Sequence, residues 1–572
     1  MPSGYTFTLL RPVAFVLLPL LVACGTPQGQ APSTAGGRGP VAGHAMVVSA
    51  HPLATAVGVQ VLREGGNAID AAVAVHNALA VVLPWAGNIG GGGFMVIRMA
   101  DGTVHTLDFR ETAPAAATRD MYLDEHGKVI TELSLLGHKA VGVPGAVAGM
   151  FAAHDSLGSL PMERLIQPAI DLAQHGFLLT ALEAEELNYA SEDLQRINTR
   201  PNAYTTRQHW NAGDSLRLPE LATTLSRIRD HGRDGFYAGE TSALIVAEME
   251  RGGGLLTAAD LAGYRAIWRP PVEGHYRSCS VYGMAPPSSG GIALIQLLEA
   301  IEPMNVRKAG VLSPATVHRM VEAERRVYAD RATHLGDPDF WRVPMAALTD
   351  SLYMHDRMVD FDPMNATPSS SIHAGAPMER EHTTHFSIVD AQGNAVSCTT
   401  TLNDSYGSKV VVGGAGFLLN NEMDDLSAAP GAPNAYGLIG GEANAIAPGK
   451  RMLSSMTPTI VTRDGKLLMV VGTPGGSTII TSVFQVVLDV LDHSMTMQEA
   501  VSTPRFHHQW LPDTIQMEPG AIAREDSLAL TRMGHAFLVR EPIGRVDAIL
   551  VLPDGRLEGG ADPRGDDRAS GY

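Results

Sequence analysis

The chain has 572 residues, and a hydrophobic share of 45% is enough for one large domain or several smaller ones. Its formal net charge of −18 argues against nucleic acid as a partner, because phosphates require a basic face. Three cysteines are too few for a disulfide framework. Cys279 and Cys398 could form one bridge, but the sequence around each is typical of an apolar strand, so we expect two separate buried thiols.

The first 42 residues have the features of an export signal followed by a linker. Arg11 precedes an apolar run, 13–23, that is too short to span a bilayer as a helix and is typical of a secretory signal peptide, 1–23. The run ends in the sequence LVAC, which is typical of a bacterial lipobox and predicts lipidation of Cys24. Residues 24–42 are rich in Gly, Pro and Gln and predict a flexible tether. A signal cleaved elsewhere, with Cys24 incidental, is the alternative. We expect an exported, periplasmic protein that reaches the membrane only through a lipid anchor.

Two helices, a glycine run and a long helical region follow. Residues 52–62 and 67–83 predict helices, the second largely buried because it is rich in Ala and Val. The glycines at 90–93 lead into a strand at 95–98; no Gly-Lys-Ser/Thr follows, so close backbone packing near a pocket is favoured over a phosphate loop. Helical patterns dominate from 161 to about 298, and another helix is predicted at 315–335. Residues 364–380 have no periodicity, which predicts an exposed segment next to a cleavage point.

The most informative stretch is a predicted β-hairpin. Residues 383–389 and 395–402 read as strands around a turn that contains Gly393. If the five-residue loop closes symmetrically, Val389 faces Ala395. The same register places Thr383 opposite Thr401, where the two hydroxyls can form a hydrogen bond.

A threonine hydroxyl is a weak nucleophile without a base beside it. Its own α-amino group can act as that base, but only when the threonine is the first residue of a chain. Thr383 would therefore need cleavage of the bond between His382 and Thr383. The alternative is that Thr383 and Thr384 are ordinary strand residues.

Four motifs, in this order, resemble the γ-glutamyltranspeptidases: TTHFS at 383–387, NNEMDD at 420–425, RMLSSMTP at 451–458 and GTPGGS at 472–477. The resemblance extends from about residue 43 to 572. That family consists of self-processing N-terminal-nucleophile hydrolases. The resemblance implies an α+β fold, a four-layer αββα sandwich of two stacked antiparallel sheets covered by helices. It also implies one globular unit cut into a large subunit, 43–382, and a small subunit, 383–572, which remain together as a heterodimer.

The resemblance implies roles for particular residues. Thr383 is the nucleophile, supported by Thr401. The other implied roles are in substrate binding and catalysis. Arg110, with Ser454 and Ser455, binds the α-carboxylate of the γ-glutamyl group, and its α-amino group is bound by Asn403, Glu422 and Asp425. Gly475 and Gly476 form the oxyanion hole, and Tyr436 lies in a lid at 430–441. Read from the residues alone, Arg110 could instead form a surface ion pair, Glu422 and Asp425 could bind a metal or cap a helix, and Gly475-Gly476 could be a plain turn.

The implied reaction takes a γ-glutamyl group from glutathione or a related amide onto Thr383 and then passes it to water, an amino acid or a dipeptide. We expect no cofactor and no metal; the run RFHHQW at 505–510 resembles a metal site but occurs in the family without one, so we interpret it as structural. The alternatives are a cephalosporin or glutaryl acylase of the same superfamily and a non-catalytic peptide-binding lipoprotein. The set built around Arg110 argues against the acylase, and an intact Thr383 argues against the binding protein.

Overall fold

The chain is organised around two antiparallel sheets, each with seven strands. The computed structural model describes residues 37–372, 383–429, 441–540 and 542–572. Residues 37–572 form one compact unit. The predicted roles of Cys24, His382 and Tyr436 lie outside the described residues, as do the signal peptide and most of the lid.

The hairpin sheet contains the predicted hairpin at its centre. Its strands, in spatial order, are β19 (Arg568–Gly571), β2 (Met46–Ser49), β10 (Thr383–Val389), β11 (Ala395–Thr401), β3 (Gly92–Arg98), β4 (Val104–Asp108) and β7 (Ile267–Arg269). Every residue of β10 and β11 is buried. The register pairs Thr383 with Thr401 and Val389 with Ala395, so the predicted closure of the loop is confirmed.

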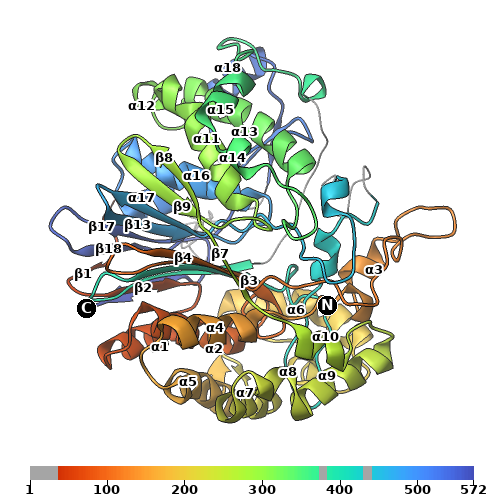
Figure 1. The fold of residues 1–572 in the computed structure, drawn as a ribbon. Helices are drawn as coiled ribbons and strands as arrows, with labels where there is room; N and C mark the ends of the chain where they lie inside the picture. Colours follow the sequence, from red (N-terminus) through yellow and green to blue (C-terminus); the bar gives the residue numbers. More distant parts are fainter. Residues whose placement is uncertain (1–36, 373–382, 430–440, 541) are drawn as a thin grey trace, which may run out of the picture. The chain divides into compact units, whose positions relative to one another are not determined.

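The second sheet lies against the hairpin sheet (Figure 1). Its strands, in spatial order, are β1 (Val41–Ala42), β18 (Leu557–Gly560), β17 (Asp547–Val551), β13 (Lys466–Gly472), β12 (Thr459–Arg463), β9 (Cys279–Gly283) and β8 (Val272–Tyr276). Side chains from the facing surfaces, among them Val48, Val96, Ile460 and Val470, form one buried cluster between the sheets. This follows the alternation of side chains along a strand, in which every second residue points to the same face.

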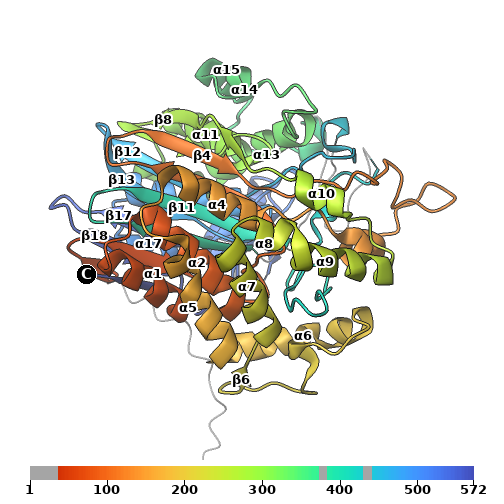
Figure 2. The same cartoon turned by 60° about the horizontal axis from the view of Figure 1, so that its bottom comes forward.

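Helices cover the outer face of each sheet, which confirms the predicted four-layer arrangement. On the hairpin sheet lie α1 (Pro52–Arg63), α2 (Ala68–Val82) and α4 (Ala146–Leu157), and around them α5 (Met162–His175), α6 (Ala181–Ile197), α7 (Pro219–His231), α8 (Asp234–Tyr237), α9 (Gly239–Gly252) and α10 (Ala258–Gly263). Figure 2 shows α1, α2, α4, α5 and α7 spread across this face. On the second sheet lie α11 (Gly290–Ile301), α16 (Thr478–Leu491) and α17 (Met497–Ser502).

Further elements complete the second layer of helices. They are α12 (Val306–Ala309), α13 (Pro314–His334), α14 (Met345–Leu348), α15 (Ser351–Arg357), α18 (Arg524–Arg532) and a small sheet of β14 (Phe506–His507), β15 (Ile515–Met517) and β16 (Phe537–Val539). α13 packs on α11, which in turn packs on β8 and β9. Two further elements are short. α3 (Glu132–Leu135) is a single helical turn, and β5 (Phe177–Leu178) pairs with β6 (Ser215–Leu216).

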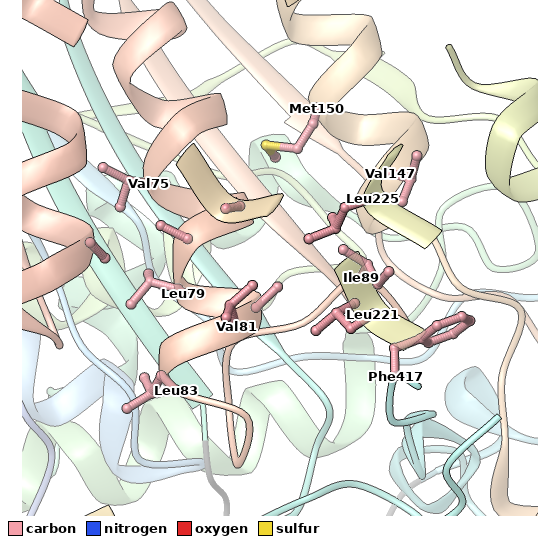
Figure 3. Close-up of a cluster of buried hydrophobic side chains, with 14 of the residues drawn as sticks. Val75, Leu79, Val81, Leu83, Ile89, Val147, Met150, Leu221, Leu225 and Phe417 are labelled. Carbon is pink, nitrogen blue, oxygen red and sulfur yellow. The ribbon is translucent and has the colours of Figure 1, made fainter. Parts of the chain in front are cut away.

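Helix α2 is the centre of the largest hydrophobic core. All fifteen of its residues are buried, and it starts with a capping box in which Asn67 and Asp70 bond each other's backbone N–H. Figure 3 shows Val75 and Leu79 of α2 near side chains from α4, α7 and the loop residues Ile89 and Phe417. Full burial of each such aliphatic side chain stabilises the fold by about 1.5–3 kcal/mol.

The structure differs from the sequence-based expectations in two stretches. β7 and β8 lie within 161–298, where helical patterns were expected, because these strands have only three to five residues. β9, in the same region, begins at Cys279, where a strand was expected. β1 lies within the predicted tether 24–42 and pairs with β18, so residues 41–42 belong to the globular unit. Cys279 and Cys398 are free and buried, as expected. Within the described ranges, no helix is long and apolar enough to cross a membrane.

Candidate active site

The hydroxyls of Thr383 and Thr401 meet at the open end of the hairpin. The Thr383 hydroxyl donates to Thr401 Oγ1 over 3.4 Å, and both side chains are buried between the sheets. The backbone N–H of Asn403 also donates to Thr401 Oγ1, at 2.8 Å. Thr401 therefore holds both the Thr383 hydroxyl and the start of the next loop, and a threonine hydroxyl so held has a restricted rotamer.

The glycine run after α2 is what allows this end of β11 to be tightly enclosed. A Cβ on Gly91 would lie 2.0 Å from the Thr401 carbonyl oxygen, so only glycine fits there. Asn88 donates from Nδ2 to the Thr401 carbonyl at 3.0 Å and to the Thr400 hydroxyl at 3.1 Å. The predicted close packing of the glycine run is confirmed, and Asn88 is an additional support that the sequence motifs did not indicate.

His385, two residues after Thr383, has a structural role. Its ring nitrogens bond the hydroxyls of Thr399, at 2.9 Å, and Ser387, at 3.1 Å. Burial lowers the pKa of His385 to about 3, so the ring is neutral at physiological pH. With both nitrogens engaged, this histidine is not available as a base for Thr383.

A charged cluster forms around Arg110, which lies two residues after the end of β4, directly after Phe109. The guanidinium bonds Glu422 and Asp425, and it also donates to the carbonyl oxygens of Met452, at 3.3 Å, and Leu453, at 3.4 Å. Arg110 is buried, so it is not the surface ion pair that the sequence left open. The structure thus brings together residues that are more than 300 positions apart in the sequence.

Two carboxyl groups in this cluster are destabilised in their charged form. Burial raises the pKa of Glu111 to about 7, although the neighbouring Arg110 acts in the opposite direction. Burial likewise raises the pKa of Glu422 well above its usual value, again opposed by Arg110. Glu111 further disfavours ionisation of Glu422, whereas a hydrogen bond with Glu422 favours the charged form of Glu111, so the two groups share a proton near neutral pH.

Buried acceptor atoms remain available beside the cluster. Among the described residues, neither Asn403 Oδ1 nor Glu422 Oε2 has a hydrogen-bond partner, although both atoms are buried. Buried polar atoms are nearly always satisfied, so each of these two oxygens can accept a further hydrogen bond. Asn403 has a positive φ of 76° and donates from Nδ2 to the Asn421 carbonyl, which ties it to the segment that carries Glu422.

Ser454 and Ser455 follow directly on the two carbonyls that bond Arg110. Ser455 Oγ accepts from Arg331 Nη2 at 2.8 Å, and Ser454 Oγ accepts from the Met456 N–H at 3.2 Å. The Ser454 carbonyl accepts from the backbone and the hydroxyl of Ser289, each at 2.7 Å. Arg331 and Ser289 are supports that the sequence motifs missed, because they come from α13 and the start of α11.

The Gly475-Gly476 turn continues from β13 toward Thr383. Ser397, which pairs with Ser387, donates to the Val471 carbonyl at 3.0 Å, and the ring of His385 lies against Gly472. The end of β13 therefore runs alongside β10 in the direction of Thr383, the first residue of β10. Gly475 and Gly476 have φ values of 130° and 59°. Neither N–H of the two glycines donates to another described residue. Two N–H groups in this position can stabilise an oxyanion.

One histidine cluster has the composition of a metal site. Among the described residues, His318, Glu322 and His535 bring ligand atoms within 4.8 Å of one another. His318 Nδ1 and His535 Nε2 are already hydrogen-bonded at 2.8 Å, and Arg326 bonds Glu322 at 2.8 Å. The adjacent guanidinium disfavours a cation, so the cluster fits a structural network. The predicted alternative of metal binding by Glu422 and Asp425 is likewise disfavoured by Arg110.

Comparison with known proteins agrees with this geometry. The sequence profile of the family described as gamma-glutamyltranspeptidase matches residues 54–572. The chain is 48% identical over 532 residues to a glutathione hydrolase proenzyme of Escherichia coli, covering 92% of each chain. It is 49% identical over 515 residues to a glutathione hydrolase proenzyme of Pseudomonas aeruginosa, covering 89% of this chain and 91% of that protein.

The fold has a solved counterpart as well. A cephalosporin acylase from Bacillus halodurans superposes with a TM-score of 0.85 at 26% identity, covering 96% of this chain and 99% of that chain. The acylase has the same architecture, but its identity to this chain is about half that of the two hydrolase proenzymes. The matched profile and these relatives together establish that the chain belongs to the γ-glutamyltranspeptidase family.

Proposed function

We propose that this protein is a glutathione hydrolase and γ-glutamyltransferase that matures by cutting its own chain before Thr383. The products would be a large subunit, 43–382 with any retained tether, and a small subunit, 383–572, in one heterodimer. The proposal rests on the hydrogen bond between the Thr383 and Thr401 hydroxyls and on the contacts of Asn403, which bonds Thr401 and the segment that carries Glu422, the partner of Arg110. The names of the two hydrolase proenzymes support the same reaction.

Maturation follows from the chemistry of a threonine next to a peptide bond. The Thr383 hydroxyl attacks the carbonyl carbon of His382, the acyl group moves from nitrogen to oxygen, and water hydrolyses the resulting ester. The reaction leaves a carboxylate on His382 and a free α-amino group on Thr383. That amino group is then the base that accepts the hydroxyl proton during catalysis.

The charged cluster is suited to the α-amino acid end of a γ-glutamyl group. Without substrate, Arg110 pairs with Glu422 and Asp425. A bound amino acid brings its own carboxylate for Arg110, assisted by Ser454 and Ser455, and its own ammonium for Asn403, Glu422 and Asp425. Each buried charge then keeps a partner, which avoids the cost of leaving one unpaired. The family resemblance also implies a substrate-binding role for Tyr436, which lies outside the described residues.

The reaction then proceeds as two acyl transfers on Thr383. The hydroxyl attacks the γ-carbonyl carbon, the α-amino group takes its proton, and the N–H groups of Gly475 and Gly476 stabilise the oxyanion. The leaving amine takes a proton as the acyl-enzyme forms. Water, an amino acid or a dipeptide then attacks the ester and regenerates the Thr383 hydroxyl.

A cephalosporin or glutaryl acylase is the second candidate, supported by the superposition with the acylase fold. Glutaryl groups lack the α-ammonium, so they would leave Asn403 Oδ1 and Glu422 Oε2 without a donor. For the location of the protein, we propose export and a lipid anchor on Cys24, based on the lipobox-like sequence before it.

A pair of chromogenic substrates tests the assignment. Purified protein is assayed with a γ-glutamyl anilide and a glutaryl anilide, each with and without a dipeptide acceptor, and Thr383→Ala serves as the inactive control. We expect rapid turnover of the γ-glutamyl anilide only, faster with the acceptor, and none in Thr383→Ala. Equal turnover of the glutaryl anilide would favour the acylase, and activity in Thr383→Ala would contradict the proposal.

A further inference from the structure

The run at 505–510, which the proposed reaction does not use, packs around the Gly475-Gly476 turn. The Ser477 hydroxyl donates to Gln509 Oε1 at 2.7 Å, and His507 Nε2 lies 2.7 Å from the same oxygen. The Thr481 hydroxyl lies 2.8 Å from His507 Nδ1. All four side chains are buried. Gln509 therefore joins the residue that follows the two glycines to the rest of the fold.

The other atoms of Ser477 and the opposite side of the turn are held as well. The Tyr328 hydroxyl of α13 donates to the Ser477 carbonyl, so the residue is fixed through its side chain and its backbone. On the other side, the Arg545 N–H donates to Thr473 Oγ1 at 2.8 Å. Arg505 donates to the Ile543 carbonyl at 2.6 Å, two residues before Arg545. Residues of the 505–510 run thus support the turn from both sides.

The turn depends on outside support because of its composition. Glycine lacks a Cβ and reaches many backbone conformations, and the φ of 130° at Gly475 is one that other residues rarely adopt. Stabilisation of an oxyanion requires donors that already point at the developing charge before the reaction. Two adjacent glycines do not supply that order themselves, so it must come from the residues that anchor the turn.

We propose that Gln509 and His507 are positioning residues that hold the Gly475-Gly476 turn with its N–H groups directed at the oxyanion. This inference rests on the proposed role of that turn in acyl transfer. Neither side chain needs to touch substrate: Gln509 acts through Ser477, and His507 fixes the Gln509 amide.

The protonation state of His507 is consistent with this arrangement. Burial lowers the pKa of His507 to about 3, so the ring is neutral and carries one proton. With that proton on Nε2, His507 donates to Gln509 Oε1 and accepts from the Thr481 hydroxyl on Nδ1. The groups that contact the ring include the side chains of Thr481, Gln509 and Tyr328, the last in an edge contact at 5.6 Å. Arg540 and His508 also lie close enough to lower the pKa of His507 further.

The test compares Gln509→Met, which keeps the length of the side chain but removes the acceptor, with Gln509→Glu, which keeps an oxygen acceptor. In the matured enzyme we expect Gln509→Met to lower kcat for the γ-glutamyl anilide about 10- to 100-fold, because displaced donors lose part of the roughly 10²–10³-fold effect of an oxyanion-hole contact. KM and inhibition by free glutamate should stay within twofold, because the Arg110 cluster is untouched. Gln509→Glu should recover most of the rate.

Matched variants separate this inference from the proposed function. Gln498→Met is the control. Gln498 lies on α17, bonds Ser502 and the Ala561 carbonyl, and should keep the wild-type rate when replaced. Gly475→Ala perturbs the turn directly. If Gly475→Ala keeps its kcat, the assignment of the oxyanion hole fails. If Gly475→Ala loses kcat and Gln509→Met does not, or if Gln509→Glu is as slow as Gln509→Met, the positioning role is overturned.

Two further measurements cover the remaining outcomes. The double variant Gly475→Ala with Gln509→Met should be no slower than Gly475→Ala alone, since both act on one turn; losses that multiply would contradict the inference. Should Gln509→Met fail to fold, Ser477→Ala removes the same contact from the other side. It should show the same loss of kcat at constant KM, and an unchanged kcat would overturn the positioning role.

Discussion

Replacement of Arg110 by lysine tests the charged cluster while it keeps the positive charge of the side chain. The guanidinium bonds Glu422 and Asp425 through separate nitrogens and reaches two backbone carbonyls. A lysine ammonium is a single point charge and cannot present two parallel donors to a carboxylate. Arg110→Lys should therefore bind the substrate α-carboxylate through one strong hydrogen bond instead of two.

The size of the effect follows from that lost bond. A hydrogen bond to a charged group contributes about 1.5–3 kcal/mol. At about 1.36 kcal/mol for each factor of ten, KM for the γ-glutamyl anilide should rise roughly 10- to 150-fold. The contact is made to a part of the substrate that does not react, so kcat should change little.

The assay measures initial rates of anilide release over a range of substrate concentrations. Arg326→Lys is the matched control, because Arg326 is equally buried and pairs with two carboxylates, Glu322 and Asp360, outside the site. Urea unfolding of both variants reports any loss of stability. A KM for Arg110→Lys within twofold of wild type, with Arg326→Lys also unchanged, would remove Arg110 from the substrate site.

Three further predictions address the hydroxyl pair, the acidic pair and the anchor. Thr401→Ala should mature slowly and lose roughly 10²-fold in kcat at constant KM, because the nucleophile loses its alignment, whereas Thr401→Ser should recover most of the rate; equal behaviour of the two in rate assays would contradict this. Ionised Glu422 binds the substrate ammonium, but burial raises the pKa of both Glu422 and Glu111, that of Glu111 to about 7, so the pair keeps a proton at mildly acidic pH. KM should therefore fall as the pH rises from 5.5 to 7.5 and flatten in Glu422→Gln; an equally steep profile in that variant would refute the reasoning. Cys24→Ser should abolish fatty-acid labelling in a bacterial host and release the protein from the membrane fraction; labelling that persists would exclude the lipobox.

The acidic pair also affects stability, with a sign set by its raised pKa values. The folded state binds a proton more tightly than the unfolded chain does, so this contribution to stability is present at low pH and is lost as the pH rises through about 7. Substrate binding drives the same proton out, so calorimetry in buffers of different ionisation enthalpy should detect its release.

The hairpin was predictable because its signals are local. Alternating residues, a glycine-containing turn and a five-residue loop determine the pairing of Thr383 with Thr401, and the structure has that register. Helix α2 was predictable for a similar reason, since its capping box and its Ala- and Val-rich sequence lie within one short segment.

Other features depend on contacts that no local pattern encodes. The partners of Arg110 lie 312 and 315 residues away, and their pairing was not predicted. The family resemblance implied only that Arg110, Glu422 and Asp425 serve the same substrate. The sequence motifs also did not indicate three residues that hold the site in place. Arg331 comes from a helix, Asn88 from a loop, and Gln509 from a run that resembles a metal site. The short strands β7 and β8 were missed because three to five residues give too few repeats of the period-two pattern.

The central claim, that Thr383 becomes the first residue of a chain and carries the acyl group, is tested most directly by sequencing the N-terminus of the smaller subunit of the purified protein. The account predicts the sequence Thr-Thr-His-Phe in the wild type and a single uncut chain in Thr383→Ala. A smaller subunit that begins at any other residue, or a Thr383→Ala protein that is still cut at the same bond, would contradict it.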